Sequence, residues 1–339
     1  MQLTDLVLEG GGVKSAGLAG AVSELARHRR FHRVAGTSAG AIVAGFVAAG
    51  LAGQLEQITV ETDVSRFLDR GRTARTLGPI GYGVDLLRGQ GLYRGEVLHR
   101  WIADTLAFAG VRTWGDLRVA GASRRTPVEQ RYSLVVVVSD VSHGRMLRLP
   151  WDFERLLGVE PDGLLVADAI RASASIPFFF RPWRLPVDPA LTQGRSELIL
   201  TDGGMLSNYP IGIFDGTCEH PTIGVKLSSR ASATETTWQN AHGTVPLGRA
   251  LVSTLVKAHT RAHVDSEEVA ARTVFVDTGH VGVTDFRIST DTKEQLFDTG
   301  RRSAAEFVAA TDAGSSSEAA ASPSRAEGTL AHRPHLVAV

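Results

Sequence analysis

The sequence predicts an α/β fold in which helices cover a mostly parallel sheet. A short apolar run at residues 6–8 and a second short strand predicted at 33–35 each end in a turn of small residues that leads into a helix-compatible segment. This order of strand, turn and helix is typical of parallel strands connected by helices on the faces of a sheet. A third run, at 133–139, contains four consecutive valines and predicts a buried strand at the centre of that sheet.

The other elements follow from apolar periodicity and from glycine and proline breaks. Helices are expected over residues 16–28, 39–49, 166–174, 248–268 and 293–310, and further strands over 197–200, 222–227 and 273–276. Residues 54–130 are expected to form a mostly helical insertion within one domain of residues 1–310. From residue 311 to 339 Ser, Ala, Pro and Gly dominate without periodicity, which predicts a disordered tail.

The composition is that of an ordinary globular protein and limits the possible partners. Lys+Arg and Asp+Glu both number 36. This balance lacks the basic excess that usually accompanies nucleic-acid binding, so no nucleic-acid partner is expected. The single cysteine, Cys218, excludes an internal disulfide framework and a multi-cysteine zinc site.

Two features of the sequence bear on location. The longest apolar run, residues 41–53, is broken by glycines and falls short of the ~20 residues that a membrane-spanning helix needs. The chain reaches strand-like sequence by Leu6, with no charged-then-apolar signal segment before it. We therefore expect a soluble, cytoplasmic protein without a transmembrane segment, for which peripheral contact with a membrane surface stays open.

Residues 36–40 read Gly-Thr-Ser-Ala-Gly and lie between a predicted strand and a predicted helix. In a nucleophile elbow, a serine stands on a strained turn, and the small residues two positions away let strand and helix pack closely. Ser38 would then stand at the positive end of the helix, with Gly36 and Gly40 supporting the turn. The alternative from the pattern alone is a glycine-rich turn with an N-cap serine.

Three successive glycines, Gly10, Gly11 and Gly12, follow the first strand. A dinucleotide-binding loop would need glycine where Ser15 stands, and an acidic residue near the end of the second strand. A Walker A loop would need glycine, in place of Val13, before the lysine. Both phosphate-loop interpretations fail, whereas an oxyanion hole fits better because consecutive glycine N–H groups can converge on one oxygen. The alternative is a plain turn between strand and helix, which three successive glycines make less suitable than one would.

A serine nucleophile needs a base, and two candidates stand out. His143 follows the central strand and would serve a Ser-Asp-His esterase. Asp202 ends an apolar strand, and Gly203 and Gly204 after it leave room beside the carboxylate. The alternative for Asp202 is a simple Asp-Gly turn.

Other residues carry weaker signals. His259 and His263 stand one helical turn apart but lack the glutamate of an H-E-x-x-H site, so no metal is expected. The phenylalanine run in 176–180 is interpreted as core in preference to the lining of an acyl pocket. Three tryptophans, Trp114, Trp151 and Trp183, do not by themselves establish a lipid interface.

Together these motifs resemble the bacterial patatin-like phospholipase family. The matching stretches are residues 10–14, 36–40 and 202–204, in the family's order, with further similarity over 171–182 and 202–210. The likeness covers roughly residues 5–310. It implies a three-layer α/β/α fold with a central, mostly parallel sheet.

The resemblance also implies a chemistry. It indicates a serine lipid acyl hydrolase of the phospholipase A type, acting on carboxylic esters of phospholipids or related lipids without a metal or other cofactor. Ser38 would attack the ester, Asp202 would accept its proton, and the N–H groups of residues 10–12 would hold the oxyanion. Lys14 matches the basic position of the first motif and is expected to be structural or to attract anions.

One position departs from the family pattern, because Ser15 stands where glycine is usual. If that position required a positive φ, serine would strain the loop. Two other functions stay open: a Ser-Asp-His esterase that uses His143, and a lipid-binding or interaction protein whose site Ser15 has disabled. Head group, acyl length, protein partner and oligomeric state do not follow from the sequence.

Overall fold

The structure is a computed structural model that describes residues 1–71, 91–192, 194–217, 220–228 and 266–321, together with residues 250 and 254. Its strands are β1 (Gln2–Leu8), β2 (Arg29–Thr37), β3 (Gly91–Tyr93), β4 (Leu134–Asp140), β5 (Arg145–Leu149), β6 (Phe178–Phe180), β7 (Trp183–Pro186), β8 (Glu197–Asp202), β9 (Thr222–Lys226) and β10 (Thr273–Phe275). Its α-helices are α1 (Ser15–His28), α2 (Ala39–Ala48), α3 (Leu55–Val60), α5 (Glu96–Phe108), α6 (Val128–Arg131), α7 (Trp151–Leu157), α8 (Val166–Ser173), α10 (Glu267–Ala271) and α11 (Thr290–Ala321).

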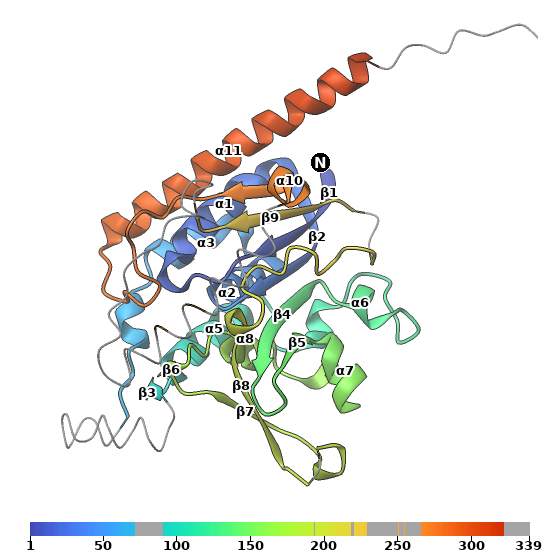
Figure 1. The fold of residues 1–339 in the computed structure, drawn as a ribbon, viewed down its shortest axis with the longest axis vertical. Helices are drawn as coiled ribbons and strands as arrows, with labels where there is room; N and C mark the ends of the chain where they lie inside the picture. Colours follow the sequence, from blue (N-terminus) through green and yellow to red (C-terminus); the bar gives the residue numbers. More distant parts are fainter. Residues whose placement is uncertain are drawn as a thin grey trace, which may run out of the picture.

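An eight-stranded sheet forms the centre of the molecule, and β3 and β6 pair separately in a two-stranded sheet (Figure 1). Its strand order is β10-β9-β1-β2-β4-β8-β7, with β5 paired to β4. Neighbours from β10 to β4 are parallel, whereas β5, β8 and β7 join in antiparallel pairs. β4, the valine-rich strand, is buried along its whole length. The predicted α/β class with a central, mostly parallel sheet is confirmed.

Two strands meet end to end along one edge of β4. β5 occupies the other edge by pairing with residues 136–140. β2 therefore shares its edge with β8, pairing with residues 134–137 while β8 pairs with 138–140. Because β2 runs parallel to β4 and β8 antiparallel, the carboxyl ends of β2 and β8 face each other. The two candidate residues Ser38 and Asp202 stand at this junction.

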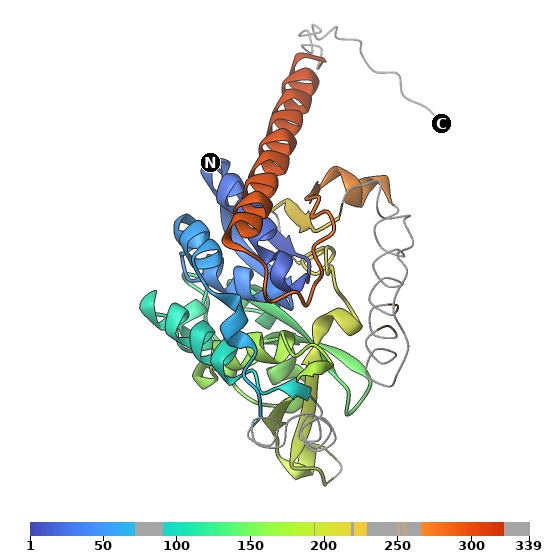
Figure 2. The ribbon, with the colours of Figure 1, turned by 90° about the vertical axis from the view of Figure 1, so that its left-hand side faces the viewer.

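Helices α1, α2 and α8 form a layer on the sheet. α2 packs on β1 and β2, α8 packs on β4 and β8, and both α1 and α8 contact α2. The long helix α11 lies along α1 and extends beyond the sheet (Figures 1 and 2). Their backbones touch at small residues: a Cβ on Gly300 would lie 2.0 Å from the Gly17 carbonyl oxygen. The two helices therefore approach more closely than side chains would permit.

The final helix is longer than the sequence predicts. We expected it over 293–310, followed by a disordered tail, but α11 also covers residues 311–321. Residues 322–339 lie outside the described residues, so the limit of the domain at 310 stays a prediction. Cys218, the two spaced histidines and nearly all of the helix expected over 248–268 also lie outside them.

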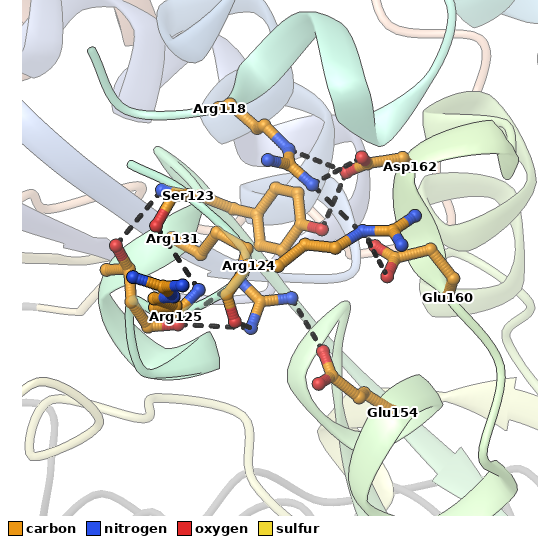
Figure 3. A network of polar contacts seen from close by, with 10 residues as sticks. Arg118, Ser123, Arg124, Arg125, Arg131, Glu154, Glu160 and Asp162 are labelled. Atoms are coloured by element: carbon orange, nitrogen blue, oxygen red, sulfur yellow. Dashed lines mark hydrogen bonds and ion pairs between the residues drawn. The ribbon is translucent and has the colours of Figure 1, made fainter. Parts of the chain in front are cut away.

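A polar network secures the segment that precedes β4 (Figure 3). The Arg118 guanidinium pairs with the Asp162 carboxylate, and the Tyr132 hydroxyl donates to Asp162 Oδ1 at 2.8 Å. Arg131 Nη1 donates to Glu154 Oε2 on α7 at 2.7 Å. Burial and the nearby carboxylate raise the pKa of Tyr132, which stays a neutral donor. The network lies where β4 begins, whereas Ser38 and Asp202 lie beside its second half.

Most of the aromatic residues noted in the sequence belong to the core. Trp114 and Trp151 are buried, so neither can form a lipid interface, whereas Trp183 is half-buried. Within the phenylalanine run, Phe179 and Phe180 are buried, as expected for core, whereas Phe178 is exposed, contrary to that expectation.

Candidate active site

Ser38 stands on a strained turn between β2 and α2. Its φ of 55° and ψ of −125° lie where residues other than glycine are rare. The turn requires glycine on both sides of the serine. A Cβ on Gly36 would lie 2.4 Å from the Gly40 carbonyl oxygen, and a Cβ on Gly40 would lie 2.5 Å from the Glu9 carbonyl oxygen. This geometry is that of a nucleophile elbow.

Ser38 and Asp202 form a direct hydrogen bond. Ser38 Oγ donates to Asp202 Oδ2 at 2.5 Å, and both residues are buried, at 4% and 6% exposure. The Gly204 N–H donates to Asp202 Oδ1 at 2.8 Å, which holds the carboxylate in place. Gly203 must be glycine, since a Cβ there would lie 2.2 Å from the Val137 carbonyl oxygen.

The surroundings of Asp202 favour its protonated form. Burial raises the pKa of Asp202 to about 6, and the hydrogen bonds from Ser38 and Gly204 oppose part of this effect. A carboxyl group with this pKa is ionised at neutral pH and is a stronger base than an exposed aspartate. It can therefore accept the proton of the serine to which it is bonded.

Ser173 is a member of the site that the sequence did not single out. Its Oγ accepts the Ser38 N–H at 2.8 Å and donates to the Val137 carbonyl oxygen at 2.6 Å. The bond to Ser173 occupies the Ser38 N–H and links the elbow to α8 and β4. The only signal in the sequence was that Ser173 falls within the family-like stretch 171–182.

The glycine-rich loop packs directly against the serine. A Cβ on Gly10 would lie 3.2 Å from Ser38 Cβ. The Gly10 N–H, however, donates to the Asn208 carbonyl oxygen at 3.0 Å, so it is already occupied. Within the described part of the chain, the N–H groups of Gly11 and Gly12 have no acceptor. Of the three glycines expected to form an oxyanion hole, two keep a donor for a ligand.

The departure at Ser15 does not strain the loop. Ser15 has a φ of −55°, in the ordinary right-handed region, and begins α1. The positive φ of 56° belongs to Gly12, where a Cβ would also lie 2.0 Å from the Val283 carbonyl oxygen. Lys14 is the N-cap residue of α1 and is half-buried.

His143 contacts the carboxylate of Asp140 and not that of Asp202. Its Nδ1 is 2.8 Å from Asp140 Oδ2, which also accepts from Arg145 Nε at 3.1 Å. The Ser38 hydroxyl bonds instead to Asp202. The structure thus brings the aspartate to the serine and leaves the alternative histidine in an ion-pair cluster after β4.

A mostly apolar cavity begins at Ser38. From the serine it extends along Ala39, Ile42 and Phe46, two turns of α2 and therefore about 12 Å. Leu98, Trp101, Phe180 and Phe286 also line it. Phe180 therefore contributes to the cavity wall as well as to the core.

One cation lies in the wall of this cavity. Lys293 Nζ donates to the Thr62 carbonyl oxygen at 2.8 Å and to that of Val60, and burial lowers the pKa of Lys293. Among the described residues, no group of three or more His, Cys, Asp or Glu side chains is arranged to hold a metal ion. No helix in that part of the chain is both long and apolar enough to cross a membrane.

Comparison with known proteins places these features in a family. The sequence profile of the patatin-like phospholipases matches residues 6–215. The uncharacterized protein YqhO of Bacillus subtilis (strain 168) is 36% identical over 306 residues, which are 90% of this chain and 97% of that protein.

Solved structures with the same fold include VipD from Legionella pneumophila. It aligns with 91% of this chain and 67% of its own, at 17% identity and a TM-score of 0.53. The ExoU–SpcU complex of Pseudomonas aeruginosa aligns with 90% of this chain and 51% of its own, at 18% identity and a TM-score of 0.45. At these identities the likeness to VipD supports the fold alone.

Proposed function

The chain belongs to the patatin-like phospholipase family, and on that premise we propose that it hydrolyses carboxylic-ester bonds of phospholipids or related lipids through a Ser38–Asp202 dyad. Family membership supports a lipid-ester hydrolase. The observation that carries the dyad is the 2.5 Å bond between Ser38 Oγ and Asp202 Oδ2 at the junction of β2 and β8.

The first half of the proposed reaction forms an acyl-enzyme. Asp202 accepts the Ser38 proton while Oγ attacks the ester carbonyl carbon, and the carbonyl oxygen becomes an oxyanion. The N–H groups of Gly11 and Gly12 supply the donors that stabilise this charge, since the Gly10 N–H already bonds to Asn208. The tetrahedral intermediate collapses, and the alcohol of the lipid leaves with the proton held by Asp202.

The second half releases the fatty acid. A water molecule loses a proton to Asp202 and attacks the acyl carbon, which again forms an oxyanion in the same loop. Collapse breaks the bond to Ser38 Oγ, which recovers the proton. A carboxylate with a pKa of about 6 suits both directions of transfer near neutral pH.

The cavity supports an acyl chain as the group that the site accommodates. It begins at Ser38 and its wall along α2 and α5 is apolar, which suits a hydrocarbon chain of the substrate. Cleavage next to that chain is the phospholipase A reaction. We place the protein in the cytoplasm, with access to lipid at a membrane surface, as predictions that go with this function.

The test is fatty-acid release from a panel of phospholipids and neutral acylglycerols by the wild type and by Ser38→Ala, Asp202→Asn and His143→Ala. We expect the first two variants to lose at least about 1,000-fold in kcat, and His143→Ala to keep its activity. Loss on His143→Ala with retention on Asp202→Asn would instead support the Ser-Asp-His esterase. A wild type that forms no Ser38-dependent adduct with a fluorophosphonate would support a lipid-binding protein.

A further inference from the structure

We propose that Asn208 is a positioning residue that orients the Gly10–Gly11 peptide, so that the Gly11 N–H faces the oxyanion. The proposal rests on the function above and goes beyond it by assigning a role to a residue outside the three catalytic motifs. Asn208 stands six positions after Asp202, in the loop that follows η7 (Gly203–Met205).

Asn208 makes a hydrogen bond to each of the two backbone polar groups of Gly10, the N–H and the C=O. The Gly10 N–H donates to the Asn208 carbonyl oxygen at 3.0 Å. In return, Asn208 Nδ2 donates to the Gly10 carbonyl oxygen at 3.2 Å. The first bond uses the main chain of Asn208 and the second uses its side chain, so only the second depends on this residue being asparagine.

The second bond determines where the next N–H points. In a trans peptide the C=O and the following N–H point in opposite directions. Since the Gly10 carbonyl points to Asn208, the Gly11 N–H is directed away from it. Among the described residues that N–H has no acceptor, while Gly10 itself packs against Ser38. A glycine on each side makes this peptide easy to rotate unless something holds it.

The neighbours of Asn208 establish which way its amide lies. Nδ2 is 3.2 Å from the Gly10 carbonyl oxygen and 3.3 Å from Glu9 Oε1. Both of these atoms can only accept, so the NH₂ group and not the carbonyl oxygen must face them. The Asn208 side chain therefore has one orientation that satisfies its partners.

The Glu9 carboxylate is itself anchored. Glu9 Oε1 accepts from Lys226 Nζ at 2.7 Å, and Oε2 accepts from the Leu227 N–H at 2.6 Å. Glu9 and Lys226 are buried, at 4% and 3% exposure. Burying an ion pair is a poor means of gaining stability, because desolvation offsets most of the attraction. Here the pair gives Asn208 a fixed acceptor next to the glycine loop.

Asn208 also touches the loop that carries the base. A Cβ on Gly204 would lie 2.7 Å from Asn208 Oδ1, and the Gly204 N–H donates to Asp202 Oδ1 at 2.8 Å. One side chain thus lies between the glycine loop and the Asp202 loop. A change at Asn208 acts on the reaction through these loops and not by touching the reacting atoms.

The test compares Asn208→Ala and Asn208→Asp with the wild type. Removing one oxyanion donor from a hydrolase costs about 100- to 1,000-fold in kcat, and misorienting one is expected to cost about 10- to 100-fold. We expect Asn208→Asp to be the more damaging, because its carboxylate would face the Gly10 carbonyl and Glu9. KM should stay within about threefold, since the acyl cavity is unchanged.

A pair of ligands separates positioning from general structural damage. A trifluoromethyl ketone lipid analogue, which forms a tetrahedral oxyanion on Ser38, should lose affinity by the same factor as kcat. An ether-linked lipid, which cannot form an oxyanion, should keep its affinity. Ser207→Ala, which changes the neighbouring side chain of the same loop, should leave kcat within about twofold.

Two outcomes would overturn the proposal. One is a kcat within threefold of the wild type in both Asn208 variants at an unchanged melting temperature. The other is an equal loss of affinity for the ketone and for the ether lipid, as a structural role would give. If the wild type releases no fatty acid yet reacts with a fluorophosphonate at Ser38, the lipid substrate is wrong. In that case the rates at which fluorophosphonate labels Ser38 in the two Asn208 variants test the proposal. Labelling rates equal to that of the wild type would reject a positioning role for Asn208.

Discussion

Ser38 Oγ donates a 2.5 Å hydrogen bond to Asp202 Oδ2 across 164 positions of sequence. The contact depends on β4, against which β2 ends at Thr37 and β8 ends at Asp202. Because the two strands approach from opposite directions along one edge, the residues at their carboxyl ends are brought together. The serine hydroxyl is therefore bonded directly to a carboxylate, without a histidine between them.

Activity should depend on one ionisation with a pKa of about 6. The base form of Asp202 is needed, and burial raises its pKa to about that value. We expect kcat/KM to fall about tenfold per pH unit below 6 and to level off above it. The control is His143→Ala, which should reproduce the wild-type profile. A profile that changes in this variant would contradict the assignment.

The free energy of unfolding should change with pH in the opposite direction to activity, falling as the pH rises. The folded pKa of Asp202 exceeds its ordinary value of 3.8, so the folded state binds this proton more tightly than the unfolded chain. Tighter proton binding by folded Asp202 stabilises the protein by about 3 kcal/mol relative to its state at high pH. This contribution is fully present below pH 3.8 and is lost as the pH rises through about 6.

Asp202→Asn removes this ionisation. Its free energy of unfolding should therefore exceed that of the wild type at pH 8 by more than it does at pH 4, as measured by urea denaturation. An equal difference at both pH values would show that Asp202 does not titrate with a raised pKa.

Replacing Ser15 by the glycine usual in the family should bring no gain. Ser15 has a φ of −55° at the start of α1, a conformation that serine adopts without strain. We expect Ser15→Gly to keep kcat/KM within about threefold and to lower stability by up to about 1 kcal/mol, because glycine is a poor helix residue. A tenfold rise in fatty-acid release would indicate that the serine impairs the loop.

A bulky side chain placed in the cavity should slow the hydrolysis of long-chain esters more than that of short-chain esters. Ile42 lies one turn along α2 from Ser38 and lines the cavity. Ile42→Trp is expected to reduce kcat/KM for long-chain esters at least tenfold, with a much smaller effect on acetate or butyrate esters. Phe108→Trp on the exposed end of α5 is the matched control and should change neither. Equal losses at all chain lengths would place the acyl chain elsewhere.

The packing of α11 on α1 should be sensitive to a single methyl group. A Cβ on Gly300 would lie 2.0 Å from the Gly17 carbonyl oxygen, so Gly300→Ala must separate the helices. We expect a loss of about 1–3 kcal/mol in urea denaturation. Gly53→Ala, where nothing lies within 4 Å of the added carbon, should have little effect. If the urea denaturation curves of Gly300→Ala and Gly53→Ala were similar, the contact between α11 and α1 would contribute little to stability.

Local patterns were sufficient for the fold class and for the candidate nucleophile. The run of valines at 135–138 predicts a central strand because such residues are stable only when buried on both faces. Gly36 and Gly40 predict the nucleophile elbow, because a turn this tight excludes any larger residue at either position. Such signals are readable in sequence because the constraint acts within a few residues of the chain.

The choice of partner for Ser38 depended on tertiary structure. His143 and Asp202 were both plausible bases, and only the antiparallel course of β8 along β4 brings Asp202 to the serine. Ser173 and the occupied N–H of Gly10 were likewise unpredictable, because each depends on a contact more than 100 residues distant. Contacts of this range are determined by strand order and loop packing, for which no local pattern exists.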